Sequence, residues 1–515
     1  MATNRKARKA PWFRIFLITG AFLLFIQRVH SQYSYDANCR EAYEAIMSLH
    51  FDDAHKLIAI EKKAEPDNLL PVYLESCIDF LTLTIGEERS VYDRLKDKIG
   101  VMVSTLENGR KDSPYYNFCL GEVHLQWAMI RLKFGDYTQA AIEIHKAYGF
   151  FSENQKRHPS FKINNIGMGV VHVLVSLVPD NYKWMSNLIG LNGSLEAGLN
   201  EIRQVAVYDG PDMIARMYKP QASFYLAFLT LNLQKNKSDA IQLVKLMDDP
   251  PFEINLKSPL EIYARATILM KNGFNDEALT VLRKRSSISQ TFSFCYLDYL
   301  EGMARLNKLD TSAFRYFEQF TARFKGRNYI GAAFQKLAWV ALLRGDSVGY
   351  RLMINKVLLQ QKPVTDEDKQ ALYEAAGGEA PNLILLRARL LSDGGYHDLA
   401  MDELLNNPVR TAVNSKRDLL EYTYRLGRIY HETGNFEKAV QNYQQTVLRG
   451  KTESYYFAAS AAYQLGLLYE NSGAYAKADS AYRMCLSINS REYKTSLHQK
   501  AKAGLNRLKT HSPKT

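Results

Sequence analysis

The sequence predicts an all-α protein built as a solenoid of antiparallel helical hairpins, an α-α superhelix. Apolar residues recur with helical spacing along the chain, and no series of short alternating segments with hairpin turns predicts a sheet. Two C-terminal stretches, 426–443 and 465–482, repeat one pattern of residues with every spacing kept. At 515 residues the chain also exceeds what one compact core usually organises, which favours an array that grows in one dimension.

The two C-terminal stretches share small and aromatic residues at matching positions. The first holds Leu426, Gly427, Tyr430, Gly434, Phe436, Ala439 and Tyr443, and the second holds Leu465, Gly466, Tyr469, Gly473, Tyr475, Ala478 and Tyr482. The glycine after each leucine lets two helices approach, the next glycine ends the first helix, and the alanine permits tight packing of the second. These spacings resemble those of the tetratricopeptide repeat, a helix-turn-helix of roughly 34 residues.

The first 31 residues predict an export signal. Basic residues open the segment, an apolar run from Ile15 to Ile26 follows, and Val29 and Ser31 suit the two positions that signal peptidase reads. We therefore expect a signal peptide over 1–31, and a mature protein in the periplasm or cell envelope. The alternative is an uncleaved N-terminal segment that anchors the protein in a membrane, although Arg14 would then lie at its edge.

Charge and cysteine content exclude several classes of function. The formal charge is +12, and six basic residues with no acidic ones lie in 1–31, so the mature chain carries about +6. This gives little support for a nucleic-acid partner. The densest basic run of the mature chain, 283–285, is predicted to be a solvated loop. Five single cysteines predict buried apolar side chains rather than a disulfide framework or a zinc site.

The mature chain divides into four predicted parts. Weaker copies of the hairpin pattern predict N-terminal helical repeats over 32–147 and middle helical repeats over 220–360. Between them, 148–219 loses the repeat phase and gains glycines and long apolar stretches, which predicts an irregular apolar helical insert. The C-terminal tetratricopeptide repeats occupy 361–515 and finish in a basic helix that we expect to cap the solenoid.

The insert contains a second resemblance. Residues 167–179 form a glycine-rich apolar run ending in Ser-Leu-Val-Pro, and 188–199 contain Gly190, Gly193 and Gly198-Leu199. This segment resembles the tetratricopeptide repeat 39 and inclusion-body-clearance family, with Leu191 where that family has phenylalanine. The resemblance implies an adaptor of membrane or lipid-body homeostasis without catalytic residues. The residues alone leave two options open: a buried core helix, or a helix at 167–179 that touches lipid or a partner's apolar surface.

Motifs for catalysis, cofactors and metals are incomplete wherever they begin. Gly450-Lys451-Thr452 lacks the earlier glycine of a phosphate loop, because Gln445 stands in its place. His124 has no potential metal ligand at helical spacing and is predicted to be structural. We therefore predict no catalytic, cofactor-binding or metal-binding residues, and the chain is not expected to be an enzyme.

The predicted binding surface is the groove lined by the first helix of each repeat. The residues at groove positions are Glu421, Tyr424, Arg428, His431, Tyr463, Leu467, Glu470 and Asn471. Tyrosine and arginine often anchor interfaces because they combine large contact area with fixed polar groups. These positions could instead make ordinary contacts between repeats. The leading hypothesis is an exported, non-enzymatic scaffold or adaptor that binds a protein or peptide; the alternative is a membrane- or lipid-associated homeostasis protein that uses helix 167–179.

Overall fold

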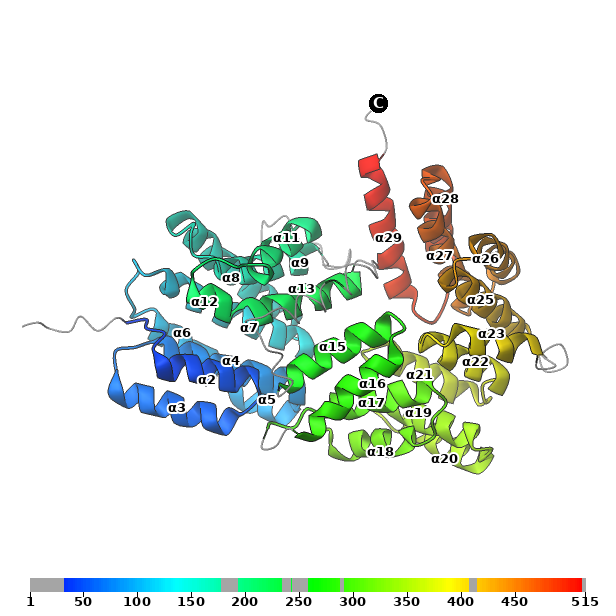
Figure 1. Ribbon diagram of the computed structural model, residues 1–515, viewed down its shortest axis with the longest axis horizontal. Helices are drawn as coiled ribbons and strands as arrows, with labels where there is room; N and C mark the ends of the chain where they lie inside the picture. Colours follow the sequence, from blue (N-terminus) through cyan, green and yellow to red (C-terminus); the bar gives the residue numbers. More distant parts are fainter. Residues whose placement is uncertain are drawn as a thin grey trace, which may run out of the picture.

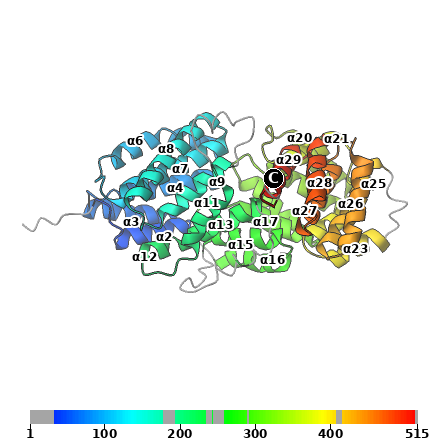
Figure 2. The same cartoon turned by 90° about the horizontal axis from the view of Figure 1, so that it is seen from above.

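A computed structural model describes residues 32–176, 193–233, 242, 258–287, 291–406 and 415–511. Within these ranges it contains 25 α-helices, one 3₁₀-helix and no strand. Most helices pair with a neighbour in sequence, and the pairs follow one another along an elongated molecule (Figure 1, Figure 2). The first helices lie at one end and α25 and α26 at the other, while the last helix, α29, lies toward the middle. The prediction of an all-α helical-hairpin array is confirmed.

The helices have the following bounds. The N-terminal region contains α2 (Ala37–Met47), α3 (Phe51–Ala64), α4 (Leu70–Gly86), α5 (Arg89–Leu95), α6 (Lys98–Leu106), α7 (Pro114–Phe134), α8 (Tyr137–Arg157), α9 (Asn164–Ser176), α11 (Leu195–Ala206), α12 (Met213–Met217) and α13 (Lys219–Leu233). The middle contains α15 (Pro259–Lys271), α16 (Asn275–Arg283), η2 (Lys284–Ser287), α17 (Tyr296–Asn307), α18 (Ala313–Arg323), α19 (Ile330–Leu343), α20 (Ser347–Leu358) and α21 (Asp366–Gly377). The C-terminal region contains α22 (Leu383–Asp393), α23 (His397–Asn406), α25 (Lys416–Glu432), α26 (Phe436–Gly450), α27 (Phe457–Asn471), α28 (Tyr475–Ser487) and α29 (Lys494–His511).

Local sequence signals set many helix ends. Ser113 caps α7 by accepting a backbone N–H bond of 3.3 Å, and Pro114 occupies the first helical position, where an N–H is not needed. The same helix ends at Gly135, whose φ of 83° is left-handed and favours glycine. Ser415 caps α25 in the same way, at 3.0 Å. These signals are local, so the helix boundaries follow from short stretches of sequence.

The two predicted repeats form the hairpins α25–α26 and α27–α28. Gly427 lies against the ring of Tyr443, and a Cβ atom there would come within 2.7 Å of the ring. Gly466 lies against Tyr482 in the same manner, and both tyrosines are 0% exposed. The chain turns after α25 at Gly434, with a φ of 80°. The glycine-aromatic interlock inferred from the spacing is therefore present in both hairpins.

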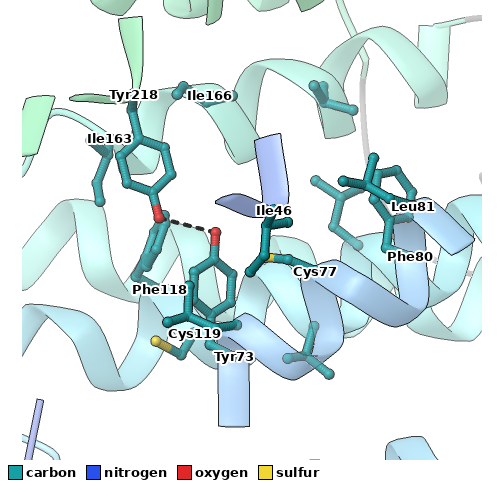
Figure 3. Close-up of a cluster of buried hydrophobic side chains, with 14 of the residues drawn as sticks. Ile46, Tyr73, Cys77, Phe80, Leu81, Phe118, Cys119, Ile163, Ile166 and Tyr218 are labelled. Atoms are coloured by element: carbon teal, nitrogen blue, oxygen red, sulfur yellow. Dashed lines mark hydrogen bonds between the residues drawn. The ribbon is translucent and has the colours of Figure 1, made fainter. Parts of the chain in front are cut away.

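A cluster of tyrosines closes the N-terminal region on itself. The hydroxyl of Tyr218, just before α13, hydrogen-bonds the hydroxyl of Tyr73 at 3.0 Å (Figure 3). It also hydrogen-bonds the hydroxyl of Tyr35. Tyr43 of α2 donates to Oε1 of Gln221 on α13 at 2.7 Å. These partners are 145 to 183 residues apart in sequence. The start of α13 therefore returns to the first helices of the chain.

The glycine-rich apolar helix α9 belongs to the core. Gly169 and Gly198 bring α9 and α11 into backbone contact, since a Cβ on either would lie 2.5 Å from the carbonyl oxygen of the other. Val171 and Val173 of α9 are 0% exposed. The sequence left two options open for this segment, and the burial of 164–176 favours a core helix. The lipid alternative depends on an exposed apolar surface, which these residues do not offer. Residues 177–179 lie outside the described residues.

Glu87 ties the N-terminal helices to the middle of the molecule. It follows α4 with a left-handed φ of 53°, and its side chain is 2% exposed. The carboxylate accepts hydrogen bonds from the Tyr296 hydroxyl at 2.5 Å and from Nδ2 of Asn328 at 2.8 Å, and it pairs with Lys133 Nζ at 2.7 Å. A left-handed glutamate costs about 1 kcal/mol, which these three contacts offset.

The hydrophobic core is continuous across two of the predicted domain boundaries. One cluster of buried side chains runs from Tyr33 to Ile268 and includes residues of α8, α9 and α11. The predicted insert, 148–219, therefore shares its core with the helices on either side. Two further clusters lie between Cys295 and Leu390 and between Leu420 and Leu508. The boundaries after 147, 219 and 360 stay predictions.

The cysteine prediction is confirmed, since all five thiols are buried and free. In the described ranges, no helix combines the length and the apolar character needed to cross a bilayer. The predicted signal peptide, 1–31, lies outside the described residues.

Candidate functional site

Two of the predicted groove residues on α25 are internal. Glu421 is 5% exposed; it accepts a hydrogen bond from Arg425 Nη2 at 3.0 Å and lies 3.6 Å from Arg417. Tyr424 is 4% exposed, and its ring lies 5.8 Å from that of Phe457 on α27. The prediction assumed an open surface at these positions, but two arginines of α25 enclose Glu421, and Phe457 of the next repeat packs on Tyr424. They support the array and offer no free contact area.

Arg428 and His431, one and two turns further along α25, are more accessible. The Arg428 side chain is 28% exposed and lies 3.4 Å from Glu432. His431 is half-buried, with Nδ1 3.4 Å from the Tyr443 hydroxyl and its ring edge-on to Phe436. This end of α25 therefore keeps surface that a partner could reach.

On α27, the C-terminal helix covers part of the predicted surface. Glu470 accepts from Arg507 of α29 at 2.7 and 2.8 Å, so one basic side chain of the predicted capping helix pairs with α27. Tyr463 is 4% exposed, Leu467 is half-buried, and Asn471 is exposed at the end of the helix. Of these four residues, Leu467 and Asn471 keep accessible surface without an ion pair to α29.

Charged and aromatic side chains from five helices and from the loop before α29 come together in the C-terminal half, and we call this group the inner face. Its residues are Lys271, Lys336, Trp339, Glu367, Glu374, Arg389, Arg417, Glu492 and Tyr493. Burial lowers the pKa of Lys271 on α15, and the charges of Glu367 on α21 and Lys500 on α29 also act on it. Figure 1 shows α29 beside α27 and α28. Helices far apart in sequence therefore share this face.

Lys336 is the unusual member of the inner face. It is 5% exposed, it donates to Oε1 of Gln335 at 2.6 Å, and no carboxylate of the described residues lies within ion-pair distance of it. Its ammonium lies 3.8 Å from the centroid of Trp339, and the Arg389 guanidinium lies 5.0 Å from the same ring. Burial, and then the charge of Arg389, lower the pKa of Lys336 to about 7. Two like charges therefore share one indole.

The nearby carboxylate of Glu374 accepts its hydrogen bonds from uncharged donors. It accepts from Gln335 Nε2 at 2.7 Å, from Trp339 Nε1 at 2.8 Å and from the Tyr350 hydroxyl at 3.2 Å. These bonds hold the indole and the Gln335 amide in place, and the amide in turn orients Lys336. An anionic group that reached Lys336 and Arg389 would thus meet two positioned cations.

The sequence contained one weak signal for this arrangement. Gln335 and Lys336 are the only polar residues of α19, and both are buried at 0% and 5% exposure. A lysine in the middle of an apolar helix is rarely buried unless it is paired. Its closeness to Arg389, on a helix more than 40 residues later, depends on tertiary packing.

Two predictions about titratable side chains can be compared with the structure. His124 is buried, with Nδ1 2.5 Å from Glu143 Oε2, in agreement with a structural role. Asp36, Cys39 and Glu61 place potential ligand atoms within 4.8 Å of one another, the one such cluster found among the described residues. Both Glu61 oxygens accept amide hydrogen bonds, at 2.8 and 3.1 Å, so local side chains already satisfy that carboxylate.

Comparison with known proteins supports the repeat assignment. The family model of the tetratricopeptide repeat matches residues 420–447 and 459–492. No curated protein sequence matches the chain. The tetratricopeptide repeat 39 resemblance is not tested by these comparisons and stays a prediction.

Two solved structures illustrate how distant the structural matches are. The human IFIT1 dimer with PPP-AAAA is 15% identical, with a TM-score of 0.35, and the match covers 81% of this chain and 95% of that one. The TPR domain of P58(IPK) is 12% identical, with a TM-score of 0.22, and the match covers 84% and 100%. At these TM-scores neither match bears on what the chain binds. The chain therefore contains two tetratricopeptide repeats in succession within an all-helical array.

Proposed function

We propose that this protein is a non-enzymatic scaffold that binds a partner protein through the inner face. Stacked helical hairpins create extended surfaces that suit protein partners. The observation on which this proposal rests is Lys336, a buried lysine with no carboxylate of the described residues within ion-pair distance, on the same fixed indole as Arg389, whose nearest carboxylate is Asp393 at 3.7 Å. The partner would add a carboxylate within hydrogen-bond distance of Lys336, from an aspartate, a glutamate or its C-terminus.

The energetic argument is that an unpaired buried charge is costly. Removing an ammonium from water costs several kcal/mol, and a second cation nearby adds to that cost. A carboxylate between Lys336 and Arg389 would accept charge-assisted hydrogen bonds from both, and would thereby offset the cost of burying the charge and the repulsion between the two cations. Because Trp339 is held by Glu374, little ordering would be needed when the partner binds.

The proposal is tested by the substitution Lys336→Met in the full chain. Methionine keeps the length and apolar stem of lysine but has no charge, so partner capture should fall about tenfold for the loss of one charge-assisted contact. The measurement is quantitative affinity purification, with identification of the proteins that co-purify. The matched control is Lys438→Met, since Lys438 is an exposed lysine on α26, outside the inner face.

Unchanged co-purification with Lys336→Met would count against the inner face as the binding surface. If the accessible part of the predicted groove also contacts the partner, Arg428→Ala should weaken capture further. Tyr424 is unsuitable for this test because its burial means that substitution would damage the fold.

We also propose that the chain is exported and processed after Ser31, with the mature protein in the periplasm or cell envelope. Support comes from the basic start, the apolar run from Ile15 to Ile26 and the small residues before Gln32. Mass spectrometry of the N-terminal peptide from an envelope fraction should find Gln32 as the first residue. A chain that retains residues 1–31 in a membrane fraction would instead support the uncleaved anchor.

A further inference from the structure

A second surface of the middle region contains two adjoining pockets that share Arg305. One pocket, of about 520 Å³, lies between α16 and the end of α17 and is lined by Asp276, Leu279, Thr280, Arg283, Arg305, Lys308 and Asp310. The other, of about 410 Å³, lies at the start of α18 and the end of α19 and is lined by Arg305, Ser312, Phe314, Arg315, Tyr316, Glu318 and Arg344. None of these residues belongs to the inner face.

Aromatic rings hold the guanidinium groups of the smaller pocket. The Cζ atoms of Arg305 and Arg315 lie 4.8 and 5.3 Å from the ring centroid of Tyr316. Arg344 lies 5.2 Å from the ring of Phe314. An arginine stacked on a ring keeps its N–H groups directed outward in one plane, ready for a planar anion. The pocket therefore presents arginines in a partly fixed orientation.

The arginines of this pocket differ in how many of their donors are used. Arg305 is engaged by Glu301 and Asp310, at 2.9 and 3.1 Å. Arg344 donates once, to the Thr311 carbonyl at 2.6 Å. For Arg315, within the described chain, the ring contact with Tyr316 is accompanied by no ion pair. Arg315 and Arg344 are both exposed, so most of their N–H groups remain available to a ligand.

The basic run 283–285 lies next to these pockets, and the prediction of a solvated loop is only partly right. Arg283 ends α16 and lines the larger pocket. Arg285 instead turns inward, where it pairs with Asp298 and Glu301, each at 2.9 Å, and lies 5.6 Å from the Tyr316 ring. Arg285 thereby helps to fix the ring on which the pocket arginines stack.

We propose that these pockets bind an acidic segment of a partner protein, with separate carboxylates meeting Arg315 and Arg344. Five basic and three acidic side chains line the two pockets together. The acidic residues are interspersed with the basic ones, which suits a peptide with separated carboxylates. A nucleic-acid backbone, with a charge at every step, would meet repulsion from Asp276, Asp310 and Glu318.

This site is independent of the inner face, so it extends the proposed function by a second contact. A single partner could use both surfaces, or two partners could be brought together on one scaffold. In either case the variant Lys336→Met should leave binding at the pockets unchanged. Failure of one proposal is thus distinguishable from failure of the other.

The test is fluorescence anisotropy of a labelled peptide that alternates glutamate and glycine, titrated with the full chain at low and at physiological salt. Binding should weaken as salt increases. The double variant R315A/R344A should lower the affinity by about tenfold or more, because two charge-assisted contacts are lost. Both side chains are exposed, so the fold should be retained. The matched control is Arg351→Ala, an exposed arginine of α20 outside the pockets.

Four results would overturn the proposal. One is no detectable binding of the glutamate peptide to the intact chain at low salt. Another is an equal loss of affinity in Arg351→Ala, which would indicate general charge attraction. The third is tighter binding of a single-stranded RNA of the same charge that is also abolished by R315A/R344A. Equal binding of a matched glutamine peptide would likewise rule out recognition of carboxylates.

Discussion

The two ends of the molecule are held together by contacts of different range. In the hairpins α25–α26 and α27–α28, each glycine meets its tyrosine 16 residues later, as Gly427 and Tyr443 do. In the N-terminal region, the contacts that close the structure join residues far apart: Tyr73 meets Tyr218 across 145 residues, and Glu87 meets Tyr296 across 209. A short sequence pattern can encode the first kind of contact but not the second.

Because of this difference, we expect the N-terminal region to unfold more cooperatively than the C-terminal hairpins. An array of local hairpins can open at one end without disturbing the rest, because its stability is close to a sum over neighbouring units. A region closed by long-range contacts should lose its structure as a unit when one of them is removed. The N-terminal region should therefore resemble a compact domain, and the C-terminal hairpins should resemble an open solenoid.

The largest expected effect separates these two behaviours directly. Tyr218→Ala removes a buried ring and two hydroxyl contacts, and should lower the free energy of unfolding by about 4 kcal/mol. Hydrogen exchange should then show lost protection from α2 through α13. Tyr482→Ala, of similar burial, should lose protection only in α27 to α29. If both variants lose protection over similarly small regions, the comparison does not hold.

Glu87 tests whether the N-terminal region is joined to the middle by one buried carboxylate. Glu87→Ala leaves the half-buried Lys133 without its ion-pair partner and the buried Tyr296 hydroxyl without its acceptor, and should cost about 3 kcal/mol. Glu87→Gln keeps hydrogen-bonding capacity and should cost less. Urea unfolding followed by tryptophan fluorescence should show one transition in the native chain and two in Glu87→Ala. A single transition at the native midpoint would contradict this role.

The stabilities of the two regions should also change in opposite directions with pH. Burial raises the pKa of Glu122, on α7, to about 8 from an ordinary value of 4.5, and burial lowers the pKa of Lys336 to about 7 from 10.5. A raised carboxyl pKa gives stability that is present below pH 4.5 and is lost as pH rises through 8. A lowered lysine pKa gives stability that is present above pH 10.5 and is lost as pH falls through 7.

Replacing either group by a neutral residue should reduce the pH dependence of stability in the region that contains it. Glu122→Gln should raise the stability of the N-terminal region at pH 8, and Lys336→Met should raise that of the C-terminal half at pH 7, each by on the order of 2 kcal/mol. Hydrogen exchange as a function of pH can assign each change to its region. A pH dependence unchanged in both variants would mean that other groups set it.

The smallest expected effect concerns the C-terminal cap. Arg507 pairs with Glu470, but its side chain is 44% exposed, so water screens the pair. Arg507→Ala should cost about 1 kcal/mol or less and should increase exchange only in α29 and the end of α27. Arg483→Ala, which removes an exposed pair on α28, is the control and should have almost no effect. Increased exchange in α25 after Arg507→Ala would argue against local fraying.

The sequence predicted those features whose physical cause is local. The spacing from Gly427 to Tyr443 reports a contact within one hairpin, so both repeats and their turns could be located. The groove assignment failed at Tyr424 because the repeat pattern specifies which face of α25 it occupies, but not that Phe457 packs onto that face. Lys336 and Arg389 could not be paired from sequence, because only the packing of α19 against later helices brings them to one indole.

The long-range contacts of Glu87 have a consequence for synthesis of the chain. Tyr296 and Asn328 leave the ribosome 209 and 241 residues after Glu87, which at typical elongation rates means a delay of roughly 10 to 50 seconds. During that time Glu87 can pair with Lys133, but its two partners in the middle of the molecule do not yet exist. Gly427 and Tyr443, by contrast, are made within a few seconds of each other. The earliest part of this protein to be translated is thus among the last to be completed.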